Sequence, residues 1–468
     1  MFLCLFLPAI LLVYYSVRKE LQNIVLLLFS LLFYAWGGPI YVFLMLFSIF
    51  INYWFGLWLN TGQISNTNRK LILTIAIVVN IAILGYFKYA NFLVDNINGI
   101  FHTNIVLEKI PLPIGISFFT FHAMSYIIDI YKRKVEAQRN LFDLALYFTI
   151  FPQLVAGPIV RYNTIAHQLH VRTVNADMFS EGIRRFILGL GKKVLIANQL
   201  GAIADEIFAM DPATMSVSTA WIGAIAYTLQ IYFDFSGYSD MAIGLGKMFG
   251  FDFLENFNYP YISKSISEFW RRWHISLGSW FRDYVYIPLG GNRVSSWKIY
   301  RNLFIVWALT GFWHGASWTF MIWGIYYGCL IALEKSGFEK ILQKLWWPIH
   351  HVYVLFLVII GWVFFRADNF SYCSKFLQAM FGLNGSLTDI TSYFYVMNYW
   401  GIFILAIVTS APIFSWIKTL FVNKKIVLLS PLYYLSVLII TMMYLTNATY
   451  NPFIYFRFLR RANYEKFN

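Results

Sequence analysis

Long apolar runs separated by short polar segments dominate the pattern along the chain. A helix that crosses a bilayer core of about 30 Å needs about 20 predominantly apolar residues. Runs near that length occupy residues 2–17, 22–36, 40–59, 71–92, 111–131, 141–160, 217–235, 301–333, 352–366, 398–418 and 427–446. The run 301–333 is long enough for one tilted helix or a broken pair. The pattern predicts an all-α polytopic membrane protein with about 11 transmembrane helices.

The middle third of the chain differs from its two ends. Between residues 150 and 320, Gly, Pro, Asp, Arg and His repeatedly interrupt the apolar pattern. Irregular backbone at membrane depth persists only where it is buried in protein or lines a water-filled cavity. We therefore expect one domain, 1–468, with N-terminal helices in 1–140, a catalytic middle region in 141–335 and C-terminal helices in 336–468.

Composition excludes most other classes of protein. Hydrophobic residues make up 59% of the chain and charged residues 12%, against roughly 45–50% and about 25% in soluble domains. Three cysteines, Cys4, Cys329 and Cys373, lie in or beside apolar runs, which argues against a disulfide framework. The net charge of +14 could indicate nucleic acid, but the basic residues flank apolar runs as in membrane proteins. We expect lipid, and no nucleic acid, as a partner.

The distribution of basic residues predicts the orientation. The first apolar run precedes Arg18 and Lys19, which is the reverse of a cleaved signal peptide, so we expect it to stay in the membrane. Basic residues also follow the third and fifth runs, at 69–70 and 132–139. The positive-inside rule places these loops in the cytoplasm and the amino terminus outside. In a bacterium this is a multi-pass protein of the cytoplasmic (inner) membrane.

Polar residues inside apolar surroundings mark candidate sites. Pro152 and Pro158 predict a bend or re-entrant segment over 151–162, either a kinked helix or a loop that lines a site. Asp234 and Asp240 adjoin the run 217–235, and an intramembrane carboxylate is costly unless it is paired or functional. Two alternatives follow, which are ion pairing with nearby arginines and direct contact with a substrate.

The segment 265–288 predicts an interfacial helix. Ser265 and Glu268 fit a capping box at its start. Over one continuous helix, an apolar stripe lies opposite a basic one; the first comprises Ile266, Phe269, Trp273, Leu277, Trp280 and Tyr284, and the second Arg271, His274, Gly278 and Arg282. Such a helix lies at a membrane surface. Its arginines would hold either the phosphates of a donor or those of lipids, and Gly278 would let a ligand approach.

His314 is the most distinctive polar residue, because it lies in the apolar run that starts at Phe304. A histidine at this depth must face the bundle interior or a polar cavity. Its neutral form can accept a proton from a hydroxyl, although a satisfied structural histidine is the alternative. Gly311 and Gly315 would let another helix or a substrate chain come close. His122 also lies inside an apolar run, and we expect it to be a structural histidine.

No metal-ligand cluster, P-loop, dinucleotide fingerprint or Gly-x-Ser-x-Gly elbow occurs in the sequence. We expect no bound metal and no bound cofactor.

Several segments together resemble the membrane-bound O-acyltransferase family, and within it the alginate O-acetyltransferase branch. They are Trp270-Arg-Arg-Trp-His274, Trp280-Phe-Arg-Asp-Tyr284, Tyr286-Ile-Pro-Leu-Gly-Gly-Asn-Arg293, Trp313-His-Gly-Ala-Ser-Trp318, Phe151–Tyr162, Tyr232–Asp240, Gly361–Asp368 and Phe453–Phe456. The resemblance implies helices around a funnel or tunnel. It places the family's invariant histidine at His314 and its second histidine at His274.

These observations predict an O-acetyltransferase that takes acetyl from a cytoplasmic donor, acetyl-CoA, for a surface polysaccharide such as alginate or peptidoglycan. His314 would be the general base. His274 would assist at the cytoplasmic mouth, either by positioning the donor or as a second acid or base. Arg271, Arg282, Trp313 and Asp234 would contact the donor or substrate. An exported hydrolase-like acetyltransferase would complete the transfer, as the resemblance suggests. The competing hypotheses are a transporter or flippase of an acylated intermediate, a non-catalytic scaffold, and transfer of a longer acyl chain.

Overall fold

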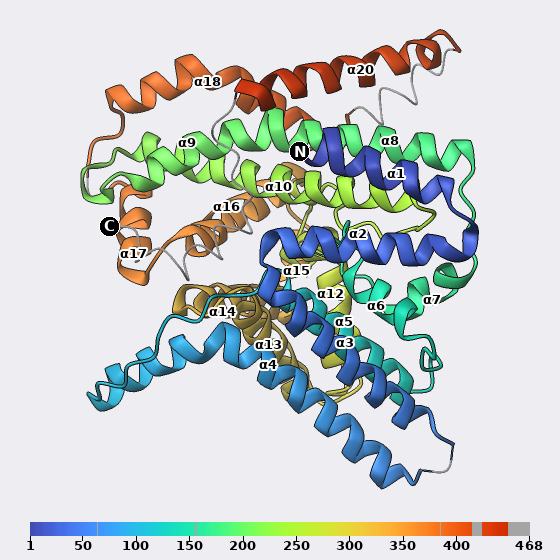
Figure 1. The fold of residues 1–468 in the computed structure, drawn as a ribbon. Coiled ribbons are helices and arrows are strands. Elements are labelled where there is room, and N and C mark those ends of the chain that lie inside the picture. Colours follow the sequence, from blue (N-terminus) through green and yellow to red (C-terminus); the bar gives the residue numbers. More distant parts are fainter. Residues whose placement is uncertain (63, 155–156, 384, 414–423, 448–468) are drawn as a thin grey trace. The chain divides into compact units, whose positions relative to one another are not determined.

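A computed structural model of the chain describes residues 1–62, 64–154, 157–383, 385–413 and 424–447, and every regular element in these ranges is a helix (Figure 1). The α-helices are α1 (Leu7–Ser16), α2 (Gln22–Gly37), α3 (Pro39–Asn60), α4 (Asn66–Phe101), α5 (Ile116–Tyr131), α6 (Leu141–Thr149), α7 (Tyr162–His170), α8 (Ala176–Gly191), α9 (Asn198–Ala209), α10 (Val217–Met248), α11 (Ile266–Arg272), α12 (Ile275–Phe281), α13 (Ser296–His314), α14 (Trp318–Leu333), α15 (Glu339–Leu342), α16 (Trp347–Arg366), α17 (Phe370–Met380), α18 (Ile390–Thr409) and α20 (Lys424–Asn447). The predicted all-α class is confirmed.

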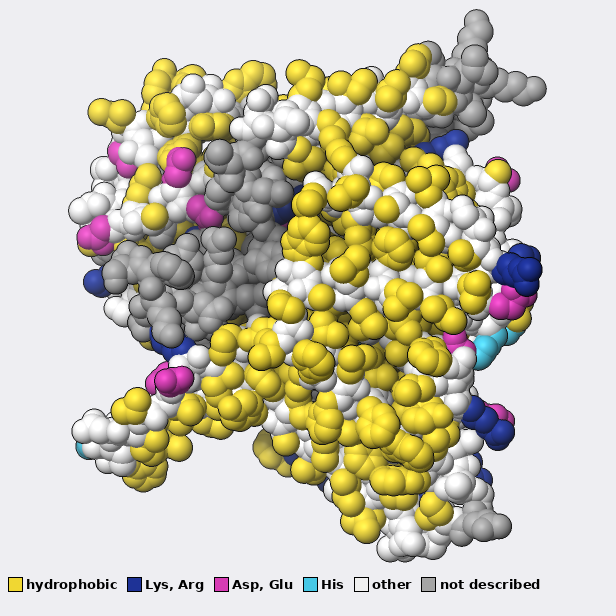
Figure 2. Space-filling view, viewed as in Figure 1, with side chains coloured by type: hydrophobic (Ala, Val, Ile, Leu, Met, Phe, Trp, Pro, Cys, Tyr) yellow, Lys and Arg dark blue, Asp and Glu magenta, His cyan; other side chains and the backbone are white. Residues whose placement is uncertain are grey.

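Six helical segments in the described residues are long and apolar enough to cross a membrane: 19–37, 39–60, 66–101, 176–209, 347–366 and 390–409. α2, α3 and α4 expose large apolar side chains on their outer faces, among them Leu28, Trp36, Phe43, Phe50 and Val78. Such surfaces are unfavourable in water and are expected in contact with lipid. Figure 2 shows hydrophobic side chains gathered over these helices. The protein is therefore a multi-pass membrane protein, and the count of about 11 crossings stays a prediction.

Two predicted features of the apolar pattern are wrong in detail. The run 141–160 is not one helix, because α6 ends at Thr149 and turns follow at 151–154. The segment 176–209 is a candidate span that the apolar pattern missed. Four cations, Arg184, Arg185, Lys192 and Lys193, interrupt the apolar run there. Three of them are ion-paired in the structure.

The chain forms two compact units that interleave along the sequence. Among the described residues, the first comprises 1–182 and 242–254, and the second comprises 183–241 and 255–447. The second unit contains the histidine segments. Its core is rich in fully buried aromatic side chains, including Tyr227, Phe269, Trp323, Tyr327 and Trp362. Such side chains bury large apolar areas, and they fix the helices that surround the histidines.

The apolar run 301–333 forms two helices, α13 and α14, which pack against each other as a hairpin with close contacts at glycines. A Cβ atom at Gly311 would collide with the carbonyl oxygen of Phe320, and one at Gly324 with the carbonyl oxygen of Trp307. The Ser317 hydroxyl accepts a hydrogen bond from the backbone N–H of Thr319 and so begins α14. Of the two alternatives for this run, the broken pair of helices is therefore correct. The glycines allow α13 and α14 to approach each other closely.

Candidate active site

His314 is the last residue of α13, at the turn of the hairpin. Its ring lies 5.0 Å from that of Trp323 and 5.1 Å from that of Phe365, both measured between ring centroids and both nearly perpendicular. Trp323 belongs to α14 and Phe365 to α16, so three helices set the position of the imidazole. His314 is half-buried, so its neighbours do not enclose the residue completely. The imidazole is thus held against aromatic rings of α14 and α16.

His274 occupies a break between two short helices, so the predicted single helix from Ser265 through Tyr284 is wrong. α11 ends at Arg272, and α12 begins at Ile275. His274 itself has φ 46° and ψ 55° in the left-handed region, which costs a non-glycine residue about 1–2 kcal/mol. The apolar and basic stripes derived from one continuous helix therefore do not exist as such.

Capping contacts hold the start of α11, as the sequence predicts in part. The Ser265 hydroxyl accepts a hydrogen bond from the Glu268 N–H at 3.0 Å, but the Glu268 carboxylate accepts from the Lys264 N–H instead of completing the box. Burial disfavours the ionised form of Glu268, yet that N–H and the Arg272 guanidinium together hold its pKa below the usual range. Ionised Glu268 thus secures the helix that leads to His274.

A buried carboxylate from α14's end holds the same helix start. Glu334, which is 1% exposed, accepts hydrogen bonds from the N–H groups of Ile266 and Ser267 at 2.6 and 2.9 Å. It also accepts one from the Ser267 hydroxyl at 2.7 Å. A carboxylate at a helix N-terminus is favourable because the first N–H groups have no partner within the helix.

The fold brings the two histidines to one indole. The Trp313 ring lies 4.9 Å from the His314 ring and 6.3 Å from the His274 ring. Trp313 is 7% exposed, and Phe235 of α10 packs edge-on against His274 at 4.7 Å. Because the two imidazoles share a neighbour, they belong to one candidate site in the second unit.

Asn256 is a site residue that the sequence interpretation missed. It is fully buried, and its side-chain oxygen Oδ1 lies 3.1 Å from His274 Nδ1. The same oxygen accepts hydrogen bonds from the Ser276 N–H at 3.2 Å and the Ser276 hydroxyl at 2.9 Å. No spacing motif links residues 256 and 274, so only the folded loop shows their contact.

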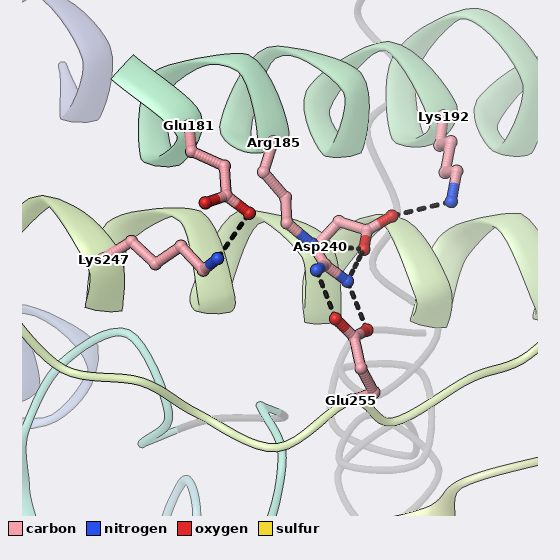
Figure 3. Close-up of polar contacts among 6 residues, drawn as sticks. All are labelled: Glu181, Arg185, Lys192, Asp240, Lys247 and Glu255. Carbon is pink, nitrogen blue, oxygen red and sulfur yellow. Dashed lines mark hydrogen bonds and ion pairs between the residues drawn. The ribbon is translucent and has the colours of Figure 1, made fainter. Parts of the chain in front are cut away.

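The carboxylates of α10 are ion-paired. Asp234 pairs with Lys193. Asp240 lies 2.8 Å from Nη2 of Arg185 and 2.6 Å from Nζ of Lys192. Figure 3 shows Arg185 between the carboxylates of Asp240 and Glu255. Both carboxylates are thus ion-paired, as one of the two alternatives predicted. The partners are two lysines and one arginine, where only arginines were expected. Contact between Asp234 and a substrate stays a prediction.

The predicted donor-binding arginines are both exposed. Arg271 is the penultimate residue of α11, and Arg282 follows α12 and hydrogen-bonds to the neighbouring carboxylate of Asp283 at 2.7 Å. Gly278 is exposed as well, and a Cβ atom there would meet only the Trp270 carbonyl oxygen, at 3.8 Å. A ligand can approach this side of α12.

Other predicted features lie elsewhere. His122, in α5 of the first unit, is 1% exposed and packs against Tyr147. The segment after α6 forms turns at 151–154 and has no regular secondary structure at 158–161, with 155–156 outside the described residues. The motif 453–456 also lies outside them. In the described part of the chain, no group of three His, Cys, Asp or Glu side chains could hold a metal ion.

A helical membrane protein that gathers two imidazoles in one aromatic site is a candidate for group transfer by proton-transfer chemistry. The family model described as membrane-bound O-acyltransferase matches residues 115–365, which include both histidines. The chain therefore belongs to the membrane-bound O-acyltransferase family, and it is an acyltransferase.

Three relatives show the range of acceptors in this family. A probable alginate O-acetylase AlgI of Azotobacter vinelandii is 48% identical over 83% of this chain and 79% of its own length. A peptidoglycan O-acetyltransferase of Helicobacter pylori is 36% identical over 82% and 79%. A teichoic acid D-alanyltransferase of Bacillus subtilis is 30% identical over 50% and 61%. The more extensive matches are to O-acetylating proteins.

Proposed function

We propose that the protein takes an acetyl group from acetyl-CoA on the cytoplasmic side and delivers it for O-acetylation of a surface polysaccharide. The observation that carries this proposal is the shared site of His274 and His314 around Trp313. The relatives named for O-acetylation of alginate and peptidoglycan support the acetyl group and the class of acceptor.

In the proposed reaction, the acceptor hydroxyl oxygen attacks the carbonyl carbon of the thioester. Neutral His314 takes the hydroxyl proton, which makes the oxygen a better nucleophile. The carbon–sulfur bond then breaks, and the thiolate leaves with the proton from the imidazolium. The half-buried position of His314 supports this role, because its neighbours do not enclose the residue completely and so leave room for a reacting hydroxyl.

The membrane separates the donor from the final acceptor. A charged donor cannot cross hydrocarbon, so we propose a passage that presents the thioester to the outer side. The amino terminus would lie outside and the basic loops in the cytoplasm of a bacterial inner membrane. An exported hydrolase-like partner would pass the acetyl group to the polymer.

The donor can be tested in inverted membrane vesicles, which expose the cytoplasmic face. We expect vesicles containing the protein to retain alkali-labile label from radiolabelled acetyl-CoA, and unlabelled palmitoyl-CoA to compete poorly. Vesicles from a strain without the protein are the control. Effective competition by palmitoyl-CoA would favour a longer acyl donor instead.

Arg271 and Arg282 are proposed to bind the donor phosphates. Because both are exposed, replacement of both by Ala should leave the fold intact. We expect the double variant to raise the donor KM about tenfold, as for lost charge-assisted hydrogen bonds of about 1.5 kcal/mol, with a smaller effect on the maximal rate. Lys298→Ala, at another exposed cation, is the matched control. An unchanged donor KM would assign the arginines to lipid phosphates.

A further inference from the structure

We infer that Asn256 is a positioning residue of the acyl-transfer site, which holds His274 with its proton on Nδ1 and the lone pair of Nε2 available to accept a proton. This inference rests on the proposed function, because it gives His274 an acid–base role beside His314. It also extends that function, since positioning of the donor was the alternative role for His274.

Hydrogen-bond chemistry identifies the atom of Asn256 that faces His274. The backbone N–H of Ser276 can only donate, and it lies 3.2 Å from one terminal atom of the Asn256 amide. That atom must therefore be the carbonyl oxygen, which can only accept. His274 Nδ1, at 3.1 Å from the same oxygen, must then be the donor. In the neutral ring this leaves Nε2 without a proton.

Asn256 also secures the unusual backbone of His274. Its main-chain oxygen accepts a hydrogen bond from the Ile275 N–H at 2.9 Å, while its side chain binds Ser276. These contacts hold both residues that follow the left-handed position. Strained backbone persists only where the surroundings fix it, and it is common where a side chain must be aimed. Asn256 therefore determines both the direction and the tautomer of the imidazole.

Nε2 of His274 is the atom that this arrangement prepares for chemistry. It is buried, and no side chain or backbone group of the described residues hydrogen-bonds to it. A buried polar atom without a partner is costly unless water or a ligand completes it. Since His274 and His314 both lie beside the Trp313 ring, we assign this lone pair to the same candidate site as His314.

The surroundings of His274 contain few groups that could change its charge. The ring contacts from other helices come from Phe235 of α10 and Trp313 of α13, neither of which titrates. The adjacent carboxylate on α10, Asp234, is held by Lys193. A charge introduced at position 256 should therefore act directly on the imidazole.

A double-mutant cycle tests whether Asn256 acts through His274. In the vesicle assay, we expect Asn256→Ala to lower the rate at saturating donor about 10²-fold, as for a misplaced catalytic group, with little change in donor KM. In a His274→Ala background, the same substitution should change the rate no more than about twofold. Asn258→Ala, at a nearby exposed amide, is the control for the loop. A full further loss in the His274→Ala background, or full activity of Asn256→Ala, would overturn the inference.

Asn256→Asp gives an independent readout, because Asp has the same shape and accepts the same hydrogen bonds. Its negative charge stabilises the imidazolium and so raises the pKa of His274. Neutral His274 is then lost at a higher pH, and the acidic limb of the pH–rate profile should move upward by about 1–2 units. An active Asn256→Asp protein with the wild-type profile would contradict the inference.

These experiments separate the inference from the proposed function. If wild-type vesicles retain no acetyl label, the proposed function fails. If they retain label and His274→Ala does so equally well, His274 has no acid–base role, and the inference fails while the reaction at His314 stands.

Discussion

Replacement of His314 by Ala should abolish O-acetylation almost completely. Proton transfer by a positioned base contributes about 10²–10⁴-fold to rate. His314 is the half-buried histidine of the candidate site, whereas His274 is 3% exposed. The measurement is the acetate released by alkali from washed surface polysaccharide, with the membrane level of the protein followed by blot. The loss should appear in the rate at saturating donor, because the proposed role lies in the chemical step.

Two variants make this result specific. His314→Gln keeps the polarity and approximate size of the side chain without a base of suitable pKa, and it should be as inactive as His314→Ala. His122→Gln changes a buried histidine of the first unit and should retain acetylation. Normal acetylation by stably expressed His314→Ala would remove the enzymatic role of His314 and would favour a scaffold that only recruits another acetylating enzyme.

The second large effect concerns stability, at the buried pair of Asp234 and Lys193. Their side chains are 1% and 10% exposed, so Asp234→Asn removes the carboxylate partner of a buried cation. Breaking a buried ion pair in this way costs about 3–5 kcal/mol. We expect a markedly lower thermal midpoint in detergent and less protein in the membrane. Glu181→Gln is the control, because Glu181 is 60% exposed in its pair with Lys247 (Figure 3) and exposed pairs contribute about 0–1 kcal/mol.

A double variant decides between the two interpretations of Asp234. Adding Lys193→Met to Asp234→Asn also removes the cation of the pair and should restore most of the lost stability. If Asp234 serves the fold through pairing, the rescued protein should also acetylate. A rescued protein that is stable but inactive would instead assign Asp234 a contact with substrate.

Hydropathy predicted the fold class because the lipid environment demands long apolar helices. The pattern of unbroken apolar runs missed the segment 176–209 because Arg185, Lys192 and Lys193 interrupt it, although an 18-residue window in the segment has a mean hydropathy of 1.3. In the structure these cations pair with Asp234 and Asp240 of α10. The run pattern contains no information about partners more than 40 residues away, so it could not show that the cations are paired.

The sequence predicted individual residues of the candidate site, but not all of the contacts that hold them in place. The position of His314 follows from Gly311 and Ser317, which close a hairpin and begin a new helix. The break at His274 did not follow from periodicity, because the flanking residues suit a helix and the left-handed turn depends on Asn256. Residues held by contacts between distant segments are the ones that sequence periodicity fails to find.

The hairpin limits how the surroundings of His314 could be redesigned. Since α13 and α14 meet backbone to backbone at Gly311 and Gly324, neither glycine can be enlarged without pushing the two helices apart. Phe365 of α16 contacts the His314 ring from another helix and is removable. A variant intended to accept propionyl or butyryl donors should therefore start from a smaller residue at position 365, with both glycines left unchanged.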